Sequence, residues 1–264
     1  MEQIKTVFSR YFFPITVLCL YLFLYIPIVI MVLFSFNANE FTFEWTGFSL
    51  RWYSELFSSI EIWDALINSL IVASMSVVLS ITLGVLLVFY STHSKFFNKA
   101  HVLFYGNLAI PEIVLAVGML SFFSFFSIPL GLTSLITGHT LIGLGYVIPI
   151  LHAQFIELDD RYTEASLDLG ATDSQTLVKV ILPLLRPALL AASLLVFIIS
   201  LDDFIISFFC VGASIQTLPL YIFSMIRSGA SPIVSALSTI LLCVSSILVL
   251  IFSSLHIKKT DILR

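Results

Sequence analysis

LINSLIVASMSVVLSITLGVLLVFY, residues 66–90, carries no charged side chain. A helix of about 20 apolar residues is long enough to cross the hydrocarbon core of a bilayer. Lipid offers no hydrogen-bonding partners to the backbone, so a spanning segment must satisfy its own N–H and C=O groups, as a helix does. The stretch therefore predicts a transmembrane helix.

The composition of the whole chain agrees with this interpretation. Hydrophobic residues make up 59% of the 264 residues and charged residues 11%, whereas soluble domains carry about 25% charged residues. The mean hydropathy is +1.09. No basic tract suggests a nucleic-acid partner. We expect an all-α, polytopic membrane protein with one transmembrane domain over 1–264. Its six spans cover approximately 11–36, 66–90, 100–127, 130–155, 187–211 and 233–256.

The placement of Lys and Arg predicts how these spans are oriented, because cytoplasmic loops carry an excess of both. The chain has 12 such residues. If the N-terminus is cytoplasmic, only Arg51 and Arg227 lie in outer loops, and all the others lie on the inner side. We therefore expect a multi-pass protein with both termini in the cytoplasm and with lipid around it.

The loop between the fourth and fifth spans, residues 157–186, is too regular for a plain connector. A short helix fits 160–169, and Gly170 suits the position just after a helix end, where φ is often positive. Thr172 then fits the N-cap of a second helix, with Gln175 three residues later completing a capping box. From pattern alone, this hairpin either lies unpartnered on the membrane face or docks onto another protein.

Residues in this loop resemble the EAA loop of the inner-membrane permeases of binding-protein-dependent ABC importers. That family's pattern is E-A-A, three residues, G, nine residues and I-x-L-P. The matching residues here are Glu164-Ala165-Ser166, Gly170 and Val180-Ile181-Leu182-Pro183. Ser166 replaces the second Ala and Val180 replaces Ile, and both changes are small.

The resemblance implies a type I ABC importer permease fold in a bacterial inner membrane. In that fold this loop is a coupling helix that docks in a groove of a cytoplasmic ATPase subunit. The residues implicated are Glu164, Ala165, Asp168, Gly170, Leu182 and Pro183. The sequence has no G-x-x-x-x-G-K-[ST] phosphate-binding pattern. We therefore expect a transport subunit that is not an enzyme and has no cofactor, with ATP used by partner subunits.

Three carboxylates, Glu112, Asp202 and Asp203, lie inside predicted spans. A charged side chain at the bilayer centre costs at least ~2.5–3.5 kcal/mol on insertion scales, so each should face the bundle interior or a water-filled path. Glu112 lies near the middle of its span, the depth at which transporter sites tend to occur. The alternative for each acid is a hydrogen-bonded packing role.

Asp202 and Asp203 point about 100° apart on a helix, so they cannot do the same job. Asp203 shares a helix face with three serines, Ser193, Ser200 and Ser207. We therefore favour Glu112 and Asp203 as residues of the substrate path. Asp202 is a third candidate, which we expect to meet a neighbouring helix or subunit.

The sequence does not predict a metal site. His139 and His152 would point to roughly opposite faces of the fourth span, which favours packing roles. The three cysteines, Cys19, Cys210 and Cys243, lie far apart in apolar runs and favour reduced, buried thiols.

Several further stretches resemble the spermidine/putrescine branch of this permease family. They are residues 44–48 with Trp52-Tyr53, Pro111-Glu112-Ile113-Val114, Leu201-Asp202-Asp203 and residues 219–242. The branch implies a second, homologous permease, a cytoplasmic ATPase dimer and a soluble polyamine-binding protein. Glu112 stands where that branch leads us to expect Asp, and its longer side chain could shift which polyamine fits.

Other functions remain open on the sequence. The same fold could carry another small solute, although an anionic cargo would need basic residues in the spans. A proton-coupled secondary transporter could use Glu112 as a relay, but the EAA-like loop has no role in that mechanism. A membrane enzyme is a third possibility, but the sequence has no motif that pairs a nucleophile with a base.

Overall fold

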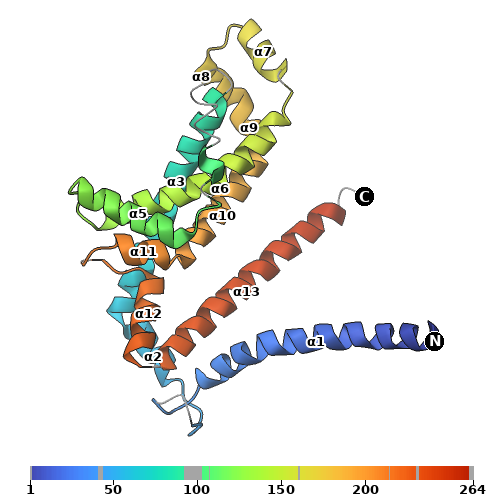
Figure 1. Cartoon of the computed structure of the whole chain (residues 1–264), viewed down its shortest axis with the longest axis vertical. Helices are drawn as coiled ribbons and strands as arrows, with labels where there is room; N and C mark the ends of the chain where they lie inside the picture. Colours follow the sequence, from blue (N-terminus) through green and yellow to red (C-terminus); the bar gives the residue numbers. More distant parts are fainter. Residues whose placement is uncertain are drawn as a thin grey trace. The chain divides into compact units, whose positions relative to one another are not determined.

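The computed structural model describes the backbone of residues 2–40, 44–91, 103–106, 108–159, 161–213, 215–229 and 232–261, with side chains except at 2–11 and 248–261. These ranges hold helices and no β-strand, with one isolated antiparallel bridge between Asn37 and Phe48. The expected all-α class is confirmed. The elements (Figure 1) are α1 (Glu2–Phe34), α2 (Arg51–Ser58), α3 (Ile60–Ser91), α5 (Glu112–Phe125), α6 (Leu132–Ile156), α7 (Arg161–Asp168), α8 (Asp173–Thr176), the π-helix η1 (Leu177–Ile181), α9 (Leu182–Leu184), α10 (Arg186–Asp202), α11 (Ile205–Cys210), α12 (Leu218–Ser228) and α13 (Pro232–Asp261).

The chain forms two compact units. The first comprises 1–60 and 222–264, and the second comprises 61–221. In the first unit α13 contacts both α1 and α2. Its connecting loop is held by Asn37, whose backbone oxygen accepts a 2.6 Å hydrogen bond from the indole N–H of Trp52. No side chain of α1 between Phe12 and Phe34 is buried, as expected of an apolar helix that lipid or another chain covers.

Among the residues that the structure describes, three helices are long and apolar enough to cross a membrane, namely Phe12–Phe34, α3 and α6. Residues 173–184 and α10 form a fourth candidate if the pair is one span, although 77° separates their axes. The shorter apolar helices are α5 and Pro232–Ile247. The expected third span, 100–127, is interrupted at residues 108–111, and the expected fifth span, 187–211, is interrupted at 203–204.

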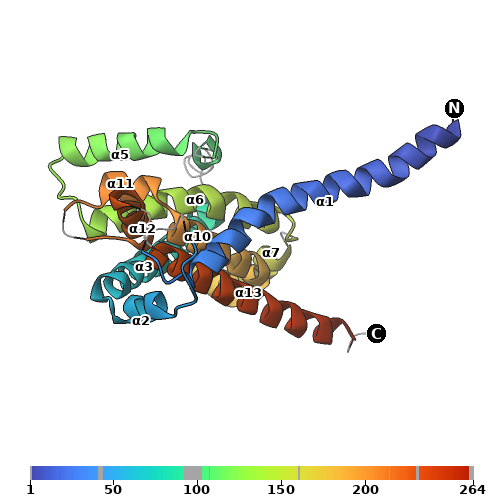
Figure 2. The same cartoon turned by 90° about the horizontal axis from the view of Figure 1, so that it is seen from below.

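The core of the second unit lies where α3, α6 and α10 meet. α10 packs along α6, and Ser76 of α3 donates a 3.3 Å hydrogen bond to the backbone oxygen of Ile136 on α6. Gly143 permits this close approach, because a Cβ there would lie 2.8 Å from Ser80 Oγ and 3.0 Å from a Val196 methyl. α11 packs against α5 and α6, and α5 and α11 lie side by side in both views (Figures 1 and 2). These contacts hold the two interrupted segments, the expected third and fifth spans, next to each other.

Candidate substrate path and coupling loop

Asp203 lies where the predicted fifth span, 187–211, is interrupted. α10 ends at Asp202, Asp203 is extended, and α11 begins at Ile205. The first N–H groups of a helix have no partner within that helix. The Asp203 carboxylate is the partner of two such groups in α11. Its Oδ1 accepts a hydrogen bond from Ile206 N at 3.3 Å, and its Oδ2 accepts one from Ser207 N at 2.9 Å. The side chain expected to line a path therefore also stabilises the break.

Glu112 lies at a second break. Residues 108–111 are not helical, and α5 begins at Glu112 directly after Pro111. Pro111 has no backbone N–H to continue a preceding helix and is well tolerated at a helix start. The Glu112 carboxyl lies close enough to Asp203 for their charges to interact. Two acids from distant parts of the sequence thus meet where two helices are interrupted.

His139 of α6 contacts Asp203 and the serines beside it. Its Nδ1 lies 2.8 Å from Ser200 Oγ, and its Nε2 lies 3.3 Å from Ser207 Oγ and 3.4 Å from Asp203 Oδ2. All four side chains are buried. The serines predicted to share a face with Asp203 therefore surround an imidazole, except for Ser193, which bonds to the backbone oxygen of Leu189 in its own helix. His139 is a satisfied packing residue, as predicted, and its partners include a candidate path acid.

Asp202 lies apart from this cluster. Its side chain is exposed, and it makes no hydrogen bond or ion pair with any residue that the structure describes. The neighbouring acids thus differ in environment, as their angular separation predicted. The structure brings together Glu112 and Asp203 and leaves Asp202 outside their contact.

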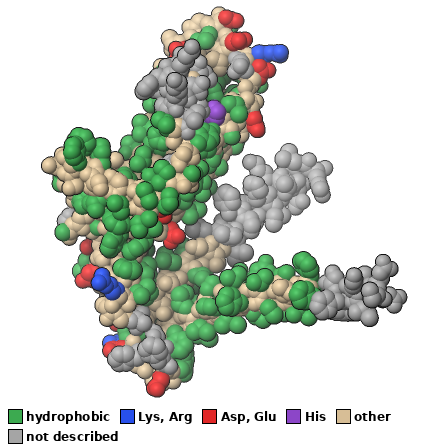
Figure 3. Space-filling model, in the orientation of Figure 1, with side chains coloured by type: hydrophobic (Ala, Val, Ile, Leu, Met, Phe, Trp, Pro, Cys, Tyr) green, Lys and Arg blue, Asp and Glu red, His purple; other side chains and the backbone are tan. Residues whose placement is uncertain are grey.

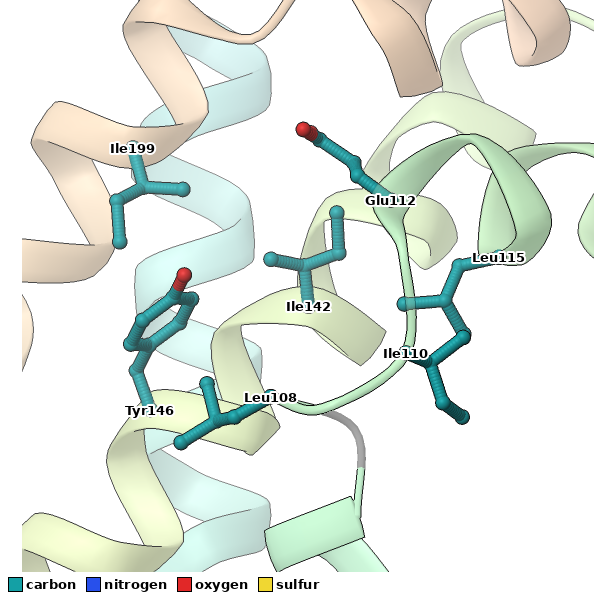
Figure 4. Close-up of a pocket in the computed structure, with 7 residues that line it drawn as sticks. All are labelled: Leu108, Ile110, Glu112, Leu115, Ile142, Tyr146 and Ile199. Carbon is teal, nitrogen blue, oxygen red and sulfur yellow. The ribbon is translucent and has the colours of Figure 1, made fainter.

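A cavity of about 130 Å³ opens beside Glu112 (Figure 4). Its lining side chains come from α5, α6, α10 and the segment before α5: Leu108, Ile110, Glu112, Leu115, Ile142, Tyr146 and Ile199. Glu112 and Tyr146 are the polar members: the Tyr146 hydroxyl points toward the space between Ile142 and Ile199, and the Glu112 carboxyl extends past Ile142. The cavity therefore combines one carboxylate and one phenol with aliphatic walls.

The loop between α6 and α10 has the local structure that the sequence predicted. α7 is followed by Gly170 with a φ of +83°, and its N–H bonds to Leu167 O at 2.8 Å. Thr172 caps α8: Gln175 N donates to Thr172 Oγ1 at 3.3 Å, and Thr172 N donates to Gln175 Oε1 at 3.0 Å. The expected glycine turn and capping box are both present.

Ser166, which departs from the family pattern, ties the two helices of this loop together. Its Oγ lies 2.9 Å from Oγ1 of Thr176, which is fully buried. Glu164, Ala165 and Asp168 on α7 are exposed, and acidic side chains gather over α7 in Figure 3. Leu182 and Pro183 are half-buried beneath. The loop is a braced hairpin that presents one acidic face.

Comparisons with known proteins identify the family of the chain. Residues 80–259 match the family described as binding-protein-dependent transport system inner membrane component. The chain belongs to this family. The permease is 37% identical over 227 residues to the spermidine/putrescine transport system permease protein PotC of Haemophilus influenzae, covering 85% of this chain and 88% of that one.

Two further comparisons extend this result. The putrescine transport system permease protein PotI of Escherichia coli is 29% identical over 215 residues, covering 78% of this permease and 76% of that protein. A crystal structure of a bacterial ABC transporter involved in the import of the acidic polysaccharide alginate contains a chain of the same fold. It has a TM-score of 0.73 and 16% identity, with 96% of each chain covered.

Sequence reasoning about the permease missed how its site is assembled. It named Glu112 and Asp203 but neither the break at 203–204 nor the contacts of His139, and it did not single out Tyr146. No proline or glycine marks the break at 203–204, so its only signal was a carboxylate three and four residues before the N–H groups that it caps.

Proposed function

We propose that this permease moves polyamines across a bacterial inner membrane as one subunit of an ATP-driven importer. It would cross the membrane six times with both termini in the cytoplasm. Its partners would be a second, homologous permease, a cytoplasmic ATPase dimer and a soluble polyamine-binding protein. The relatives support this cargo, since PotC is named for spermidine and putrescine and PotI for putrescine.

The observation that carries the proposal is the meeting of Glu112 and Asp203 inside apolar segments. Two carboxylates this close repel each other, and a cation between them relieves the repulsion. No Lys or Arg occurs between Lys99 and Arg161 or between Arg186 and Arg227, so these segments supply no Lys or Arg as a counter-ion. A multiply charged amine would supply it.

The donors to Asp203 support the same cargo. They are two backbone N–H groups, and the imidazole of His139 lies 3.4 Å from Oδ2. Such donors hold the carboxylate in place without the full positive charge of a Lys or Arg. Asp203 therefore keeps its attraction for a cationic substrate while it stabilises the helix break.

Transport would proceed by alternating access. Substrate released by the binding protein enters from outside and occupies the path beside Glu112 and Asp203. ATP binding and hydrolysis in the partner subunits then move α7, which is joined to the site through η1, α9 and α10. A braced hairpin transmits such a movement as a rigid body, and the path opens toward the cytoplasm.

Reconstitution into liposomes tests the proposal. The permease, its second permease and its ATPase are reconstituted, and radiolabelled spermidine is supplied with the binding protein. We expect uptake that requires ATP and all subunits and that persists when a protonophore collapses the proton gradient. Uptake by the permease alone that follows the proton gradient would establish a secondary transporter instead. ATP-dependent uptake of another solute in place of spermidine would overturn the cargo.

A further inference from the structure

We propose that Tyr146 and Glu112 form a subsite for one ammonium-terminated alkyl arm of the substrate, with the Tyr146 hydroxyl and the Glu112 carboxylate both binding the ammonium. The inference rests on the proposed function and adds to it where, and by which side chains, one end of the polyamine is held. Tyr146 becomes a substrate-binding residue of the path.

Tyr146 lies on the face of α6 that carries the other contacts of the path. Ile142 is one turn before it and His139 two turns before it, so the three side chains form one stripe. His139 binds Asp203, whereas Ile142 and Tyr146 line the cavity beside Glu112. A single helix face therefore serves both acids.

The Tyr146 hydroxyl makes no hydrogen bond with any residue that the structure describes. A polar group in an apolar environment is usually paired, because leaving it unpaired costs free energy. Figure 4 shows this hydroxyl directed into the cavity that Glu112 also lines. A ligand with hydrogen-bond donors would satisfy both oxygens together.

The size and walls of the cavity define the ligand more narrowly. Its volume of about 130 Å³ is well below the ~300–1,000 Å³ of pockets that enclose a drug-sized molecule, so it fits one arm of a longer chain. Leu115, Ile142 and Ile199 provide aliphatic surface for methylene groups. An ammonium donates its protons to the two oxygens and, unlike an anion, is attracted by the carboxylate.

Two substitutions separate the hydroxyl from the ring. Tyr146→Phe removes only the hydroxyl, and Tyr146→Leu also removes the aromatic ring. Tyr105→Phe is the matched control, because it removes a hydroxyl that bonds to His152 Nδ1 at 3.0 Å outside this cavity. Each variant is assembled with its partner subunits, and ATP-driven uptake of putrescine and of spermidine is measured over a range of concentrations.

We expect Tyr146→Phe to raise KM for both amines about tenfold with kcat retained, which is the effect of losing one hydrogen bond to a charged group. Tyr146→Leu should raise KM further, and Tyr105→Phe should match the parent. A parental KM in Tyr146→Phe and Tyr146→Leu would overturn the subsite, even if Glu112→Gln impairs uptake and so upholds the proposed function. A parent complex that takes up neither amine would overturn both.

Discussion

His139 on α6 and Ser200 near the end of α10 are joined by a hydrogen bond of 2.8 Å between Nδ1 and Oγ. All neighbouring groups are satisfied if Ser200 donates to Nδ1 and the protonated Nε2 donates toward Asp203 Oδ2, 3.4 Å away, or Ser207 Oγ. One imidazole therefore links α10, the break at Asp203 and α11. The position of a candidate path acid depends on a third helix.

Replacing His139 should impair transport through Asp203. His139→Leu removes the donor and leaves buried polar groups without a partner, which costs about 1–3 kcal/mol for each group. We expect a large loss of spermidine uptake, and we expect His139→Gln to retain more activity because its amide can still donate. Uptake is measured at equal amounts of assembled complex. Equal uptake by the parent and His139→Leu would show that Asp203 does not need this contact.

Reversing a charge on the proposed coupling loop, residues 157–186, should separate ATP hydrolysis from transport. Glu164 is exposed on α7, so Glu164→Lys should disturb the docked face without affecting the fold. We expect normal insertion, with spermidine uptake strongly reduced per ATP hydrolysed. Glu157→Lys, an equal charge change at an exposed position outside α7, is the control. If Glu164→Lys takes up as much spermidine per ATP hydrolysed as the parent, Glu164 does not contribute to the contact with the ATPase.

Gly170 gives an independent test of the same loop. Its φ is +83°, and an added Cβ would meet no atom within 4 Å, so substitution acts through the backbone alone. Gly170→Val places a β-branched residue in the left-handed region, at a cost of ~1–3 kcal/mol, and should uncouple the complex. Gly170→Asn should be tolerated, because Asn also occurs at this position of a helix end. We expect the ratio of transport to ATP hydrolysis to fall in the Val variant only.

The helix packing behind the site should be sensitive to one methyl group. Gly143→Ala would force Ser80 and Val196 away from α6, and overpacking of this kind costs about 1–3 kcal/mol. Gly118→Ala, on α5, meets no atom within 4 Å and should be neutral or stabilising, as Gly-to-Ala changes in helices often are. Thermal unfolding of the purified permease in detergent compares the two. A midpoint for Gly143→Ala at or above the parental value would contradict this packing.

Local features of the molecule were predictable from the sequence. Gly170, Thr172 and Gln175 act within a few residues of one another, so their turn and capping box could be predicted without knowledge of the fold. Pro111 is also well tolerated at a helix start, although the expected third span, 100–127, ran through it without a break. These features follow from the local backbone preferences of the residues themselves.

The assembly of the site was not predictable in the same way. The break after Asp202 lies in an apolar run without proline or glycine, and it is stabilised by a capping carboxylate and by His139, which lies far away in the sequence. Periodicity placed Ser200, Asp203 and Ser207 on one face, but only packing shows that this face meets α6. The Tyr146 hydroxyl gave no signal, because a tyrosine in an apolar helix is common.

The central claim is that the carboxyls of Glu112 and Asp203 together bind a polyamine in transit. The most direct measurement is ATP-driven spermidine uptake by complexes that contain Glu112→Gln, Asp203→Asn or both, compared at equal amounts of assembled transporter. The account predicts that each substitution lowers uptake far more than it lowers assembly, and that the double variant is close to inactive. Parental uptake by the double variant, in a complex that assembles normally, would contradict it.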